Sequence, residues 1–470
     1  MNDAIVISQE VRFDRALIEK YDRAGPRYTS YPTAPHFHEG FGSTDFIQEI
    51  NRSSTEKPDR PLSLYLHIPF CDTVCYYCAC NKIITPDRTR ALPYLEALMH
   101  EIALMAHHFS SDRAVRQIHF GGGSPSYLTL EQTIRLWATL RENFHLVDKS
   151  EGEYGIEADP RECPPGTIAQ LGEIGFNRIS FGVQDLEPAV QKAVNRIQPL
   201  ELTQRCVREA RANGFHSINL DLIYGLPLQT EESFLKTLEV VITELAPDRL
   251  AVFNYAHLPQ YFTPQRRIDV NQLPSAEVKL RIFEQTISRL LAAGYVYVGM
   301  DHFAKPDDEL AKSQRQGSLH RNFQGYTTRA ECDLVGLGLT SISQFDHAYA
   351  QNYKTLPEYY ARINAGELAI FRGLALNADD RIRRDVIMRL MCDFMLDRQL
   401  TGERLGIDFD HYFAAENQEI ARMVNEGLLE DDGRSIRVTA GGRLLIRNVC
   451  MAFDWYLANG PQKKAFSKTI

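Results

Sequence analysis

Four of the nine cysteines in this 470-residue chain fall within ten residues, at Cys71, Cys75, Cys78 and Cys80. Thiolates at the spacing Cys-x3-Cys-x2-Cys can hold three corners of a cubane iron–sulfur cluster, whose full ligation takes four protein ligands. Cys80 is a candidate for the fourth ligand, and four thiolates could instead bind zinc. Structural zinc sites usually pair two short cysteine motifs, and the sequence has no second one. The spacing therefore favours iron–sulfur, and a cluster held by three cysteines would leave one iron open to a small ligand.

Glycines and carboxylates form a second group of candidates. The run GGGSP at 121–125 follows an expected strand but lacks the G-x-G-x-x-G spacing of a dinucleotide site, so alone it indicates a tight turn. Glu157 and Asp221 fall at or near expected strand ends, where a carboxylate can hydrogen-bond a ribose diol. A capping or ion-paired role remains open for each. Binding is favoured because these features share one predicted face of the fold.

The elements that position these residues alternate between strand and helix. Residues 62–68 alternate apolar and polar side chains as a strand does, and Pro69 ends the strand just before the cysteines. Further strands are predicted at 117–120, 154–158, 178–183, 217–223, 249–255 and 296–300. Helices are predicted at 91–109, 129–144, 165–174, 187–195, 202–213, 231–245 and 277–293. This alternation predicts an α/β fold, a parallel sheet curled into a closed or partial (β/α) barrel, with its loops gathered at one end.

Three parts are predicted along the chain: an N-terminal arm at 1–55, a catalytic barrel at 56–350 and a mainly helical domain at 351–470. The Tyr-, Pro- and Arg-rich stretch at 21–37 indicates an arm across the barrel, and the same arm could cover an active site. Helices at 379–396, 409–427 and 441–457, with a hairpin turning at Asp432-Gly433, resemble a winged-helix module. DNA binding and simple packing are both open, and the net charge of -9 favours packing.

The amino-acid composition restricts the class of protein to which the chain can belong. The chain is 44% hydrophobic and 24% charged, as in ordinary globular proteins. No apolar run approaches the ~20 residues of a membrane span, and the N-terminus is too mixed in charge for a signal peptide. We therefore expect a cytoplasmic location, in which the five scattered cysteines are buried free thiols.

The cysteine triad followed by GGGSP resembles the radical S-adenosylmethionine (SAM) enzymes. Within this superfamily, the chain is most similar to the oxygen-independent coproporphyrinogen III oxidase family. This resemblance covers nearly the whole chain, from about Tyr21 onward. The motifs that carry it are GPRYTSYPTAP, HIPFC…CYYCACNK, FGGGSPSYL, IEADPRE, RISFGVQD, NLDLIYGLP, FNYAHLP, GMDHFAKPDDELA, HRNFQGYTT and GRLLIRNVCMAFD.

This resemblance implies a radical SAM partial TIM-like barrel and a defined reaction. A [4Fe-4S] cluster on Cys71, Cys75 and Cys78 would bind SAM through its open iron, with Cys80 as a non-ligand. Reductive cleavage of SAM would give a 5′-deoxyadenosyl radical that abstracts hydrogen from a propionate of coproporphyrinogen III. Loss of CO2 and an electron leaves a vinyl group, and two such steps give protoporphyrinogen IX in haem synthesis. The resemblance also implies a monomer and an electron donor that the sequence does not name.

The resemblance further implies two SAM molecules per chain. Residues implied for the first are Tyr65, Gly122, Glu157 and Ile342, of which Tyr65 and Glu157 are catalytic candidates. Residues implied for the second are Tyr77, Gly123, Ser124, Gln184, Arg196, Asp221 and Ala256. Tyr77 stands where the family often has Phe, a difference that bears on packing at the second SAM. Because the substrate carries four carboxylates, we expect cations, and Arg27 and Arg321 lie in two distinctive polar motifs.

Two alternatives remain at this stage. A haem-binding chaperone relative would share the triad and the barrel but deliver haem. The Cys78–Cys80 pair with Asn81-Lys82, the N-terminal arm and the C-terminal domain favour the enzyme. A metal-binding regulator with a DNA-binding wing would instead bind duplex DNA tightly.

Overall fold

A parallel sheet built around β1 (Leu62–Ile68) carries the cysteine loop at its carboxyl end. The computed structural model describes residues 10–460 and residue 466. The strands run in the order β9-β8-β7-β6-β4-β1-β14, and every neighbouring pair is parallel. Their bounds are β4 (Ala114–Gly122), β6 (Glu153–Ala158), β7 (Arg178–Gln184), β8 (Ser217–Tyr224), β9 (Arg249–Asn254) and β14 (Asp333–Leu337). The predicted α/β partial barrel is confirmed.

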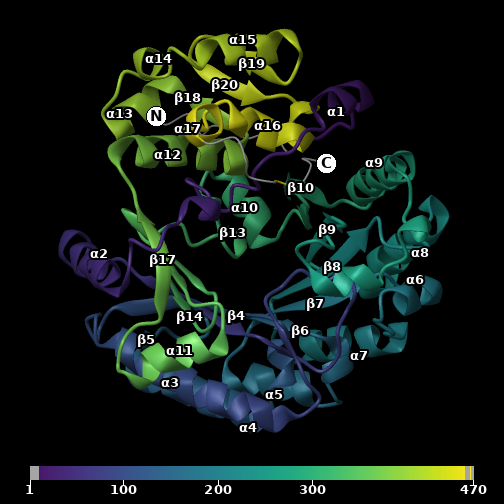
Figure 1. The fold of residues 1–470 in the computed structure, drawn as a ribbon. Helices are drawn as coiled ribbons and strands as arrows, with labels where there is room; N and C mark the ends of the chain where they lie inside the picture. Colours follow the sequence, from purple (N-terminus) through teal and green to yellow (C-terminus); the bar gives the residue numbers. More distant parts are fainter. Residues whose placement is uncertain (1–9, 461–465, 467–470) are drawn as a thin grey trace. The chain divides into compact units, whose positions relative to one another are not determined.

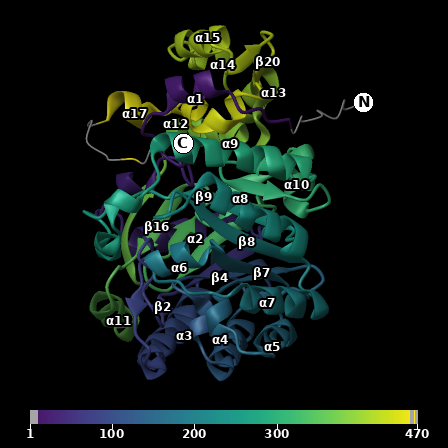
Figure 2. The same cartoon turned by 90° about the vertical axis from the view of Figure 1, so that its right-hand side faces the viewer.

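Helices follow the strands and cover the outer face of the sheet (Figure 1). Their bounds are α2 (Ser43–Glu56), α3 (Leu92–Ala106), α4 (Leu130–Asn143), α5 (Thr167–Ile174), α6 (Pro188–Ala193), α7 (Leu200–Ala212), α8 (Glu231–Val240) and α11 (Leu356–Asn364). Helices α3, α4, α5 and α7 pack side by side in that order, and Figure 2 shows them below the strands. The start of α4 is fixed by a capping box of Thr129 and Gln132.

The two faces of the sheet differ in chemistry. In β7, Ile179, Phe181 and Val183 are buried, whereas the alternating residues between them are partly exposed and polar or small. The same alternation in β8 leaves Asn219 and Asp221 on the partly exposed face. The apolar face packs under the helices, so the polar face is left for a site.

Residues 301–345 contain a strand that the sequence analysis missed. Strand β14 pairs parallel with β1, with Leu62 opposite Asp333 and Leu66 opposite Leu337. All five of its residues are buried, so the sequence lacks the alternation of a half-exposed strand. The antiparallel strands β15 (Ile342–Gln344), β16 (Ala348–Asn352) and β17 (Ile370–Ala375) extend this edge.

Two minor ladders complete this part. The pair β2 (Phe70–Cys71) and β3 (Ile83–Ile84) is parallel, and β5 (His145–Leu146) pairs with β4. The described residues form two compact units, one of residues 37–286 and 331–375 and the other of residues 10–36, 287–330 and 376–460. Helix α9 (Ala276–Ala292) runs through the division. The three-part division at residues 55 and 350 stays a prediction, and its residues 1–9 lie outside the described part.

The second unit combines helices with short antiparallel sheets. Its helices are α1 (Arg15–Tyr21), α10 (Glu309–Arg315), α12 (Ala378–Asp393), α13 (Arg398–Leu405), α14 (Phe409–Tyr412), α15 (Asn417–Asn425), α16 (Ile446–Met451) and α17 (Trp455–Asn459). Its strands are β10 (Val296–Gly299), β11 (His302–Ala304), β12 (His320–Asn322), β13 (Gly325–Thr327), β18 (Met395–Asp397), β19 (Leu429–Asp431) and β20 (Ser435–Val438).

Two expectations about this unit are resolved. The hairpin turning at Asp432-Gly433 is confirmed as β19–β20. The single helix expected at 441–457 is wrong, because Asp454 accepts the backbone N–H groups of Tyr456 and Leu457 and so starts α17 as a separate helix. The helix expected at 409–427 is likewise divided, into α14 and α15. Across the described residues, no helix has both the length and the apolar character needed to cross a bilayer.

Candidate functional site

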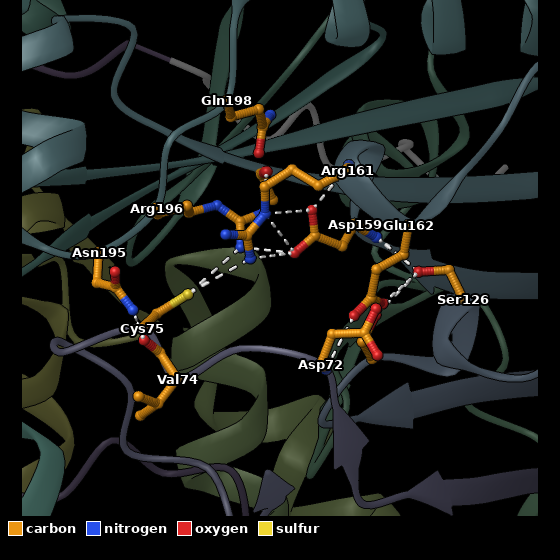
Figure 3. Close-up of polar contacts among 12 residues, drawn as sticks. Asp72, Val74, Cys75, Ser126, Asp159, Arg161, Glu162, Asn195, Arg196 and Gln198 are labelled. Atoms are coloured by element: carbon orange, nitrogen blue, oxygen red, sulfur yellow. Dashed lines mark hydrogen bonds and ion pairs between the residues drawn. The ribbon is translucent and has the colours of Figure 1, made fainter. Parts of the chain in front are cut away.

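The cysteine loop, residues 71–84, is fixed at its base and at its middle. The β2–β3 ladder joins its ends. The Tyr76 N–H donates to the Val194 carbonyl at 3.0 Å, and Asn195 Nδ2 donates to the Val74 carbonyl at 2.8 Å, as Figure 3 shows for the second bond. These bonds tie the loop to the segment after α6, so the thiols are held against the end of the sheet.

A cavity of about 190 Å³ opens between this loop and the polar face of the strands. Most residues expected from the sequence line it: Cys71, Cys75, Tyr77, Cys78, Cys80, Gly122, Gly123, Ser124, Glu157, Gln184, Arg196 and Asp221. Sequence reasoning missed Ser180, Gly182 and Arg161, which also line it. Strand alternation signals Ser180 and Gly182, because they share a face of β7 with Gln184.

Three of the residues expected to bind SAM do not line the cavity. Tyr65 lies in β1, where its ring stacks on His119 at a centroid distance of 6.0 Å. Ile342 begins β15, and its backbone leaves no room for a side chain at Gly336, the register partner of Tyr65. Gln265 Nε2 donates to the Ala256 carbonyl at 3.3 Å and to the Tyr77 carbonyl at 3.0 Å. Ile342 is thus beside Tyr65, and Ala256 beside the cysteine loop.

The three successive glycines serve close packing within the protein. Gly122 has φ of 121°, and a Cβ there would meet the His67 ring at 2.7 Å. A Cβ at Gly123 would meet the backbone of Pro69 and Phe70 at 2.8 Å. Glycine is needed at both positions because the loop and the His67 ring press against this turn.

Ser124 and Glu162 form a polar pair at the same turn. The Ser124 hydroxyl donates to Glu162, which also accepts the Asp72 N–H at 3.2 Å. The hydroxyl that the resemblance assigns to SAM therefore already has a protein acceptor. Figure 3 shows Glu162 between Asp72 and Ser126.

A histidine–carboxylate pair shapes the charge beside β1. Glu157 Oε1 lies 3.2 Å from His119 Nε2, and Glu157 Oε2 accepts the Gly122 N–H at 3.2 Å. Burial alone would raise the pKa of Glu157, but these hydrogen bonds and the charge of His119 lower it. Glu157 is therefore an ionised acceptor, suited to a ribose diol or an ammonium group.

His67 and Tyr65 form a second pair with a defined tautomer. His67 Nε2 lies 3.2 Å from the Asn81 carbonyl, which can only accept, so Nε2 carries the proton. Burial lowers the pKa of His67, which leaves the neutral Nδ1 to accept the Tyr65 hydroxyl at 3.1 Å. The pair links β1 to the end of the cysteine loop. His67 belongs to the HIPFC motif, and that motif was the sequence signal from which its role in the site could have been predicted.

Asp221 and Gln184 present polar atoms to the cavity. Asp221 accepts the Asn219 amide at 2.8 Å, and burial together with the nearby Glu157 charge raises the pKa of Asp221 to about 7. Gln184 has φ of 68°, and within the described part of the chain its buried Oε1 has no hydrogen-bond partner. An unpartnered acceptor here suits an ammonium or hydroxyl donor from a ligand.

The thiols fit an iron–sulfur cluster by their donor set. Cys71, Cys75 and Cys78 all face one cavity, and a hydrogen bond from the Cys80 thiol, aided by Lys82, lowers the pKa of Cys78 to about 5. Among the described residues, no three His, Cys, Asp or Glu side chains lie close enough to share a single metal ion. Thiolates at separate corners of a cubane do not converge on one ion, so the arrangement is compatible with three-cysteine ligation.

The two arginines expected to bind substrate lie in the second unit. Arg27 forms an ion pair with Asp301. Arg321 is 3% exposed and lies 4.7 Å over the Tyr326 ring. Over the residues that the structure describes, Arg321 Nε and Nη1 have no hydrogen-bond partner. Arg27 is therefore neutralised by the protein, whereas Arg321 keeps donors for an anion.

The partial barrel, with three thiols on the loop after its first strand and a polar cavity beside them, defines a radical SAM enzyme. The Radical SAM superfamily model matches residues 65–241, and the HemN C-terminal domain model matches residues 376–445.

Proteins named oxygen-independent coproporphyrinogen III oxidase match over nearly the full length. The Pseudomonas aeruginosa protein is 51% identical over 460 residues, covering 98% of this chain and 99% of the relative. The Escherichia coli protein is 50% identical over 462 residues, with the same coverage of both chains. The solved coproporphyrinogen III oxidase (HemN) from Escherichia coli, described as a radical SAM enzyme, superposes with a TM-score of 0.90 at 49% identity, over 95% of this chain and 100% of that one.

The chain therefore belongs to the oxygen-independent coproporphyrinogen III oxidase family of radical SAM enzymes, whose cofactors are a [4Fe-4S] cluster and SAM. This family performs anaerobic oxidative decarboxylation in haem biosynthesis. The enzyme class, cofactors and fold class expected from the sequence are confirmed.

Proposed function

We propose that this chain converts coproporphyrinogen III to protoporphyrinogen IX by decarboxylating two propionate side chains to vinyl groups without O2. The observation that carries this proposal is the 51% identity with an oxygen-independent coproporphyrinogen III oxidase over 98% of the chain. The thiol-lined cavity supports it, since a lining of thiols, carboxylates and cationic side chains suits a cluster and a zwitterionic nucleoside.

Cys71, Cys75 and Cys78 are the proposed cluster ligands, and Cys80 is not one. The support is that all three face the cavity from a loop fixed at its base and middle. The reduced cluster and SAM, when bound, supply a 5′-deoxyadenosyl radical that abstracts hydrogen from the substrate. The chain's own residues orient SAM and exclude other hydrogen donors.

The first SAM is proposed to contact Tyr65, Gly122, Glu157 and Ile342. Glu157 is the strongest member of this set, because its lowered pKa keeps it ionised and its carboxylate faces the cavity. Tyr65 acts from beside it, through a hydroxyl oriented by His67. Tyr65 and Glu157 are thus proposed to orient the cofactor.

The second SAM is proposed to use Tyr77, Gly123, Ser124, Gln184, Arg196, Asp221 and Ala256. Gln184 Oε1 supports this set, because it is a buried acceptor with no hydrogen-bond donor among the described residues. Arg196 is 6% exposed and can pair with a carboxylate. Ser124 is the weakest member because its hydroxyl donates to Glu162.

Arg321 is the proposed principal cation for a substrate propionate, with Arg27 secondary. A buried guanidinium with unused N–H groups gains charge-assisted hydrogen bonds when a carboxylate arrives. A separate reductase is proposed to supply electrons to a monomeric, cytoplasmic enzyme. The net charge of -9 disfavours nucleic acid and anionic membranes as partners.

An anaerobic assay tests the proposal. The reconstituted protein is supplied with SAM, dithionite, coproporphyrinogen III and an acceptor for the electron that leaves the substrate radical with CO2. Loss of coproporphyrinogen with formation of protoporphyrinogen, CO2 and 5′-deoxyadenosine is the expected result. Stable haem binding without turnover would support the haem-chaperone alternative instead, and tight duplex DNA binding without turnover would support the regulator.

A further inference from the structure

The sulfur of Cys75 lies against two guanidinium groups. Arg161 Nη2 and Arg196 Nη1 are each 3.6 Å from Cys75 Sγ, and Figure 3 shows both approaching the sulfur. Cys75 is 8% exposed, so water competes little for these contacts. Two N–H donors thus converge on one of the three proposed cluster ligands.

Asp159 fixes both arginines in place. Its Oδ2 accepts Arg161 Nη2 at 2.6 Å and Arg196 Nη1 at 2.8 Å, and its Oδ1 accepts Arg161 Nε at 3.0 Å. Ser126 Oγ in turn accepts the Asp159 N–H at 2.9 Å. The pair of cations and the single carboxylate leave a net positive group against Cys75, with little freedom to turn away.

The other two thiols have different neighbours. Across the described residues, no arginine donates to Cys71 or Cys78; Glu162 lies near Cys71, and Cys80 and Lys82 face Cys78. The positive charge is therefore placed on one ligand rather than spread over the loop. The arrangement is more specific than general compensation of a metal site.

We propose that Arg161 is a positioning residue that donates an N–H···S hydrogen bond to Cys75 and thereby raises the reduction potential of the cluster. Reduction adds negative charge to the cluster and its sulfurs, and a nearby donor and cation stabilise that charge. Arg196 contributes from the other side, but it also has a proposed SAM role. Arg161 has no other assignment, so it isolates the effect. The inference rests on Cys75 being a ligand, as the proposed function holds.

The test compares Arg161→Met, Arg161→Lys and Arg88→Met with the wild type in the full-length protein. Arg88 pairs with Asp72 at 2.9 Å, next to Cys71 in sequence, and donates to no sulfur within the described part of the chain, so its variant controls for a lost charge beside the loop. Each protein is reconstituted anaerobically, its iron and sulfide are counted, and the cluster is titrated by EPR at poised potentials without SAM.

We expect Arg161→Met to retain its cluster while the ratio of reduced to oxidised cluster at a fixed potential falls about tenfold, a shift of about 59 mV to lower potential for one electron. Arg161→Lys keeps the positive charge but lacks the forked N–H groups of the guanidinium, so its reduction potential should shift less. Arg88→Met should match the wild type.

An Arg161→Met cluster with wild-type potential, or an equal shift in Arg88→Met, would overturn the proposal. If Arg161→Met takes up no iron, the reduction potential of the Arg161→Lys cluster is the deciding measurement. Loss of iron in both variants, with Arg88→Met loaded, assigns Arg161 to retention of the cluster and overturns tuning. A Cys75→Ser protein that keeps a SAM-responsive cluster would instead refute the ligand assignment, so the two failures are distinguishable.

Discussion

Glu101, in the middle of α3, accepts the backbone N–H of Gly338 at 2.7 Å, joining the helix to the turn after β14. Glu101 is fully buried, and it also accepts the Asn352 amide and the Tyr359 hydroxyl, each at 2.6 Å. The neighbouring Tyr94 hydroxyl donates to the His67 carbonyl at 2.6 Å. This buried network holds the end of β1, from which the cysteine loop departs.

Glu101→Ala should destabilise the protein by about 3 kcal/mol, because the buried Gly338 N–H and Tyr359 hydroxyl lose their acceptor and the Asn352 amide keeps only the Gly338 carbonyl among the described residues. Urea unfolding of the two proteins at neutral pH measures the difference. Glu96→Ala is the matched control, since Glu96 lies on the same helix but its side chain is 61% exposed and pairs with Arg135 at the surface. Equal stability of Glu101→Ala and Glu96→Ala would show that the network does not stabilise the fold.

Cys75→Ser should lose most of its iron after reconstitution, whereas Cys80→Ser should keep a cluster whose EPR signal changes on adding SAM. Cys75 is buried against the cavity, while Cys80 is exposed and hydrogen-bonds Cys78. Iron and sulfide counts with EPR, with and without SAM, measure both. The reverse pattern would make Cys80 a ligand, and an unchanged wild-type signal on adding SAM would contradict an open iron.

Asp221→Asn should change how stability depends on pH. Burial raises the pKa of Asp221 from 3.8 to about 7, so between these values the folded protein binds a proton that the unfolded chain has released. Stability should therefore fall as pH rises from about 4 to 7. The Asn variant keeps the acceptor for Asn219 but cannot ionise, so it should be more stable than the wild type at pH 8 and equal to it at pH 4. Unfolding midpoints of the cluster-free proteins measure this, and parallel pH profiles would contradict the raised pKa.

The cysteine loop and the parallel strands could be predicted because local sequence determines them. Alternating apolar and polar residues predict β1, and Pro69 ends the strand. The spacing of the thiols indicates that they bind an iron–sulfur cluster. The carboxyl ends of parallel strands meet at one edge, so Glu157 and Asp221 were correctly expected on a common face.

The features that were missed depend on contacts far apart in sequence. Strand β14 is buried throughout, so it carries no alternating signal. Arg161 contacts Cys75 across 86 positions, and nothing in its own segment distinguishes it from a surface arginine. The ion pair of Arg27 with Asp301 joins residues 274 positions apart and could not be read from the Arg27 motif either, and the role of Arg27 toward substrate stays a prediction.

Arg321→Met should weaken binding of coproporphyrinogen III by about tenfold or more, since a hydrogen bond to a charged group contributes about 1.5–3 kcal/mol. Arg27→Met should weaken it less, because Arg27 is already ion-paired with Asp301. Anaerobic fluorescence or equilibrium binding without SAM measures affinity apart from turnover. Arg315→Met, on the exposed face of α10, is the control and should bind normally. If Arg321→Met binds as tightly as Arg315→Met, the buried guanidinium is not the substrate cation. An effect of Arg27→Met larger than that of Arg321→Met would mean that substrate displaces Asp301 from Arg27, and would reverse their proposed ranks.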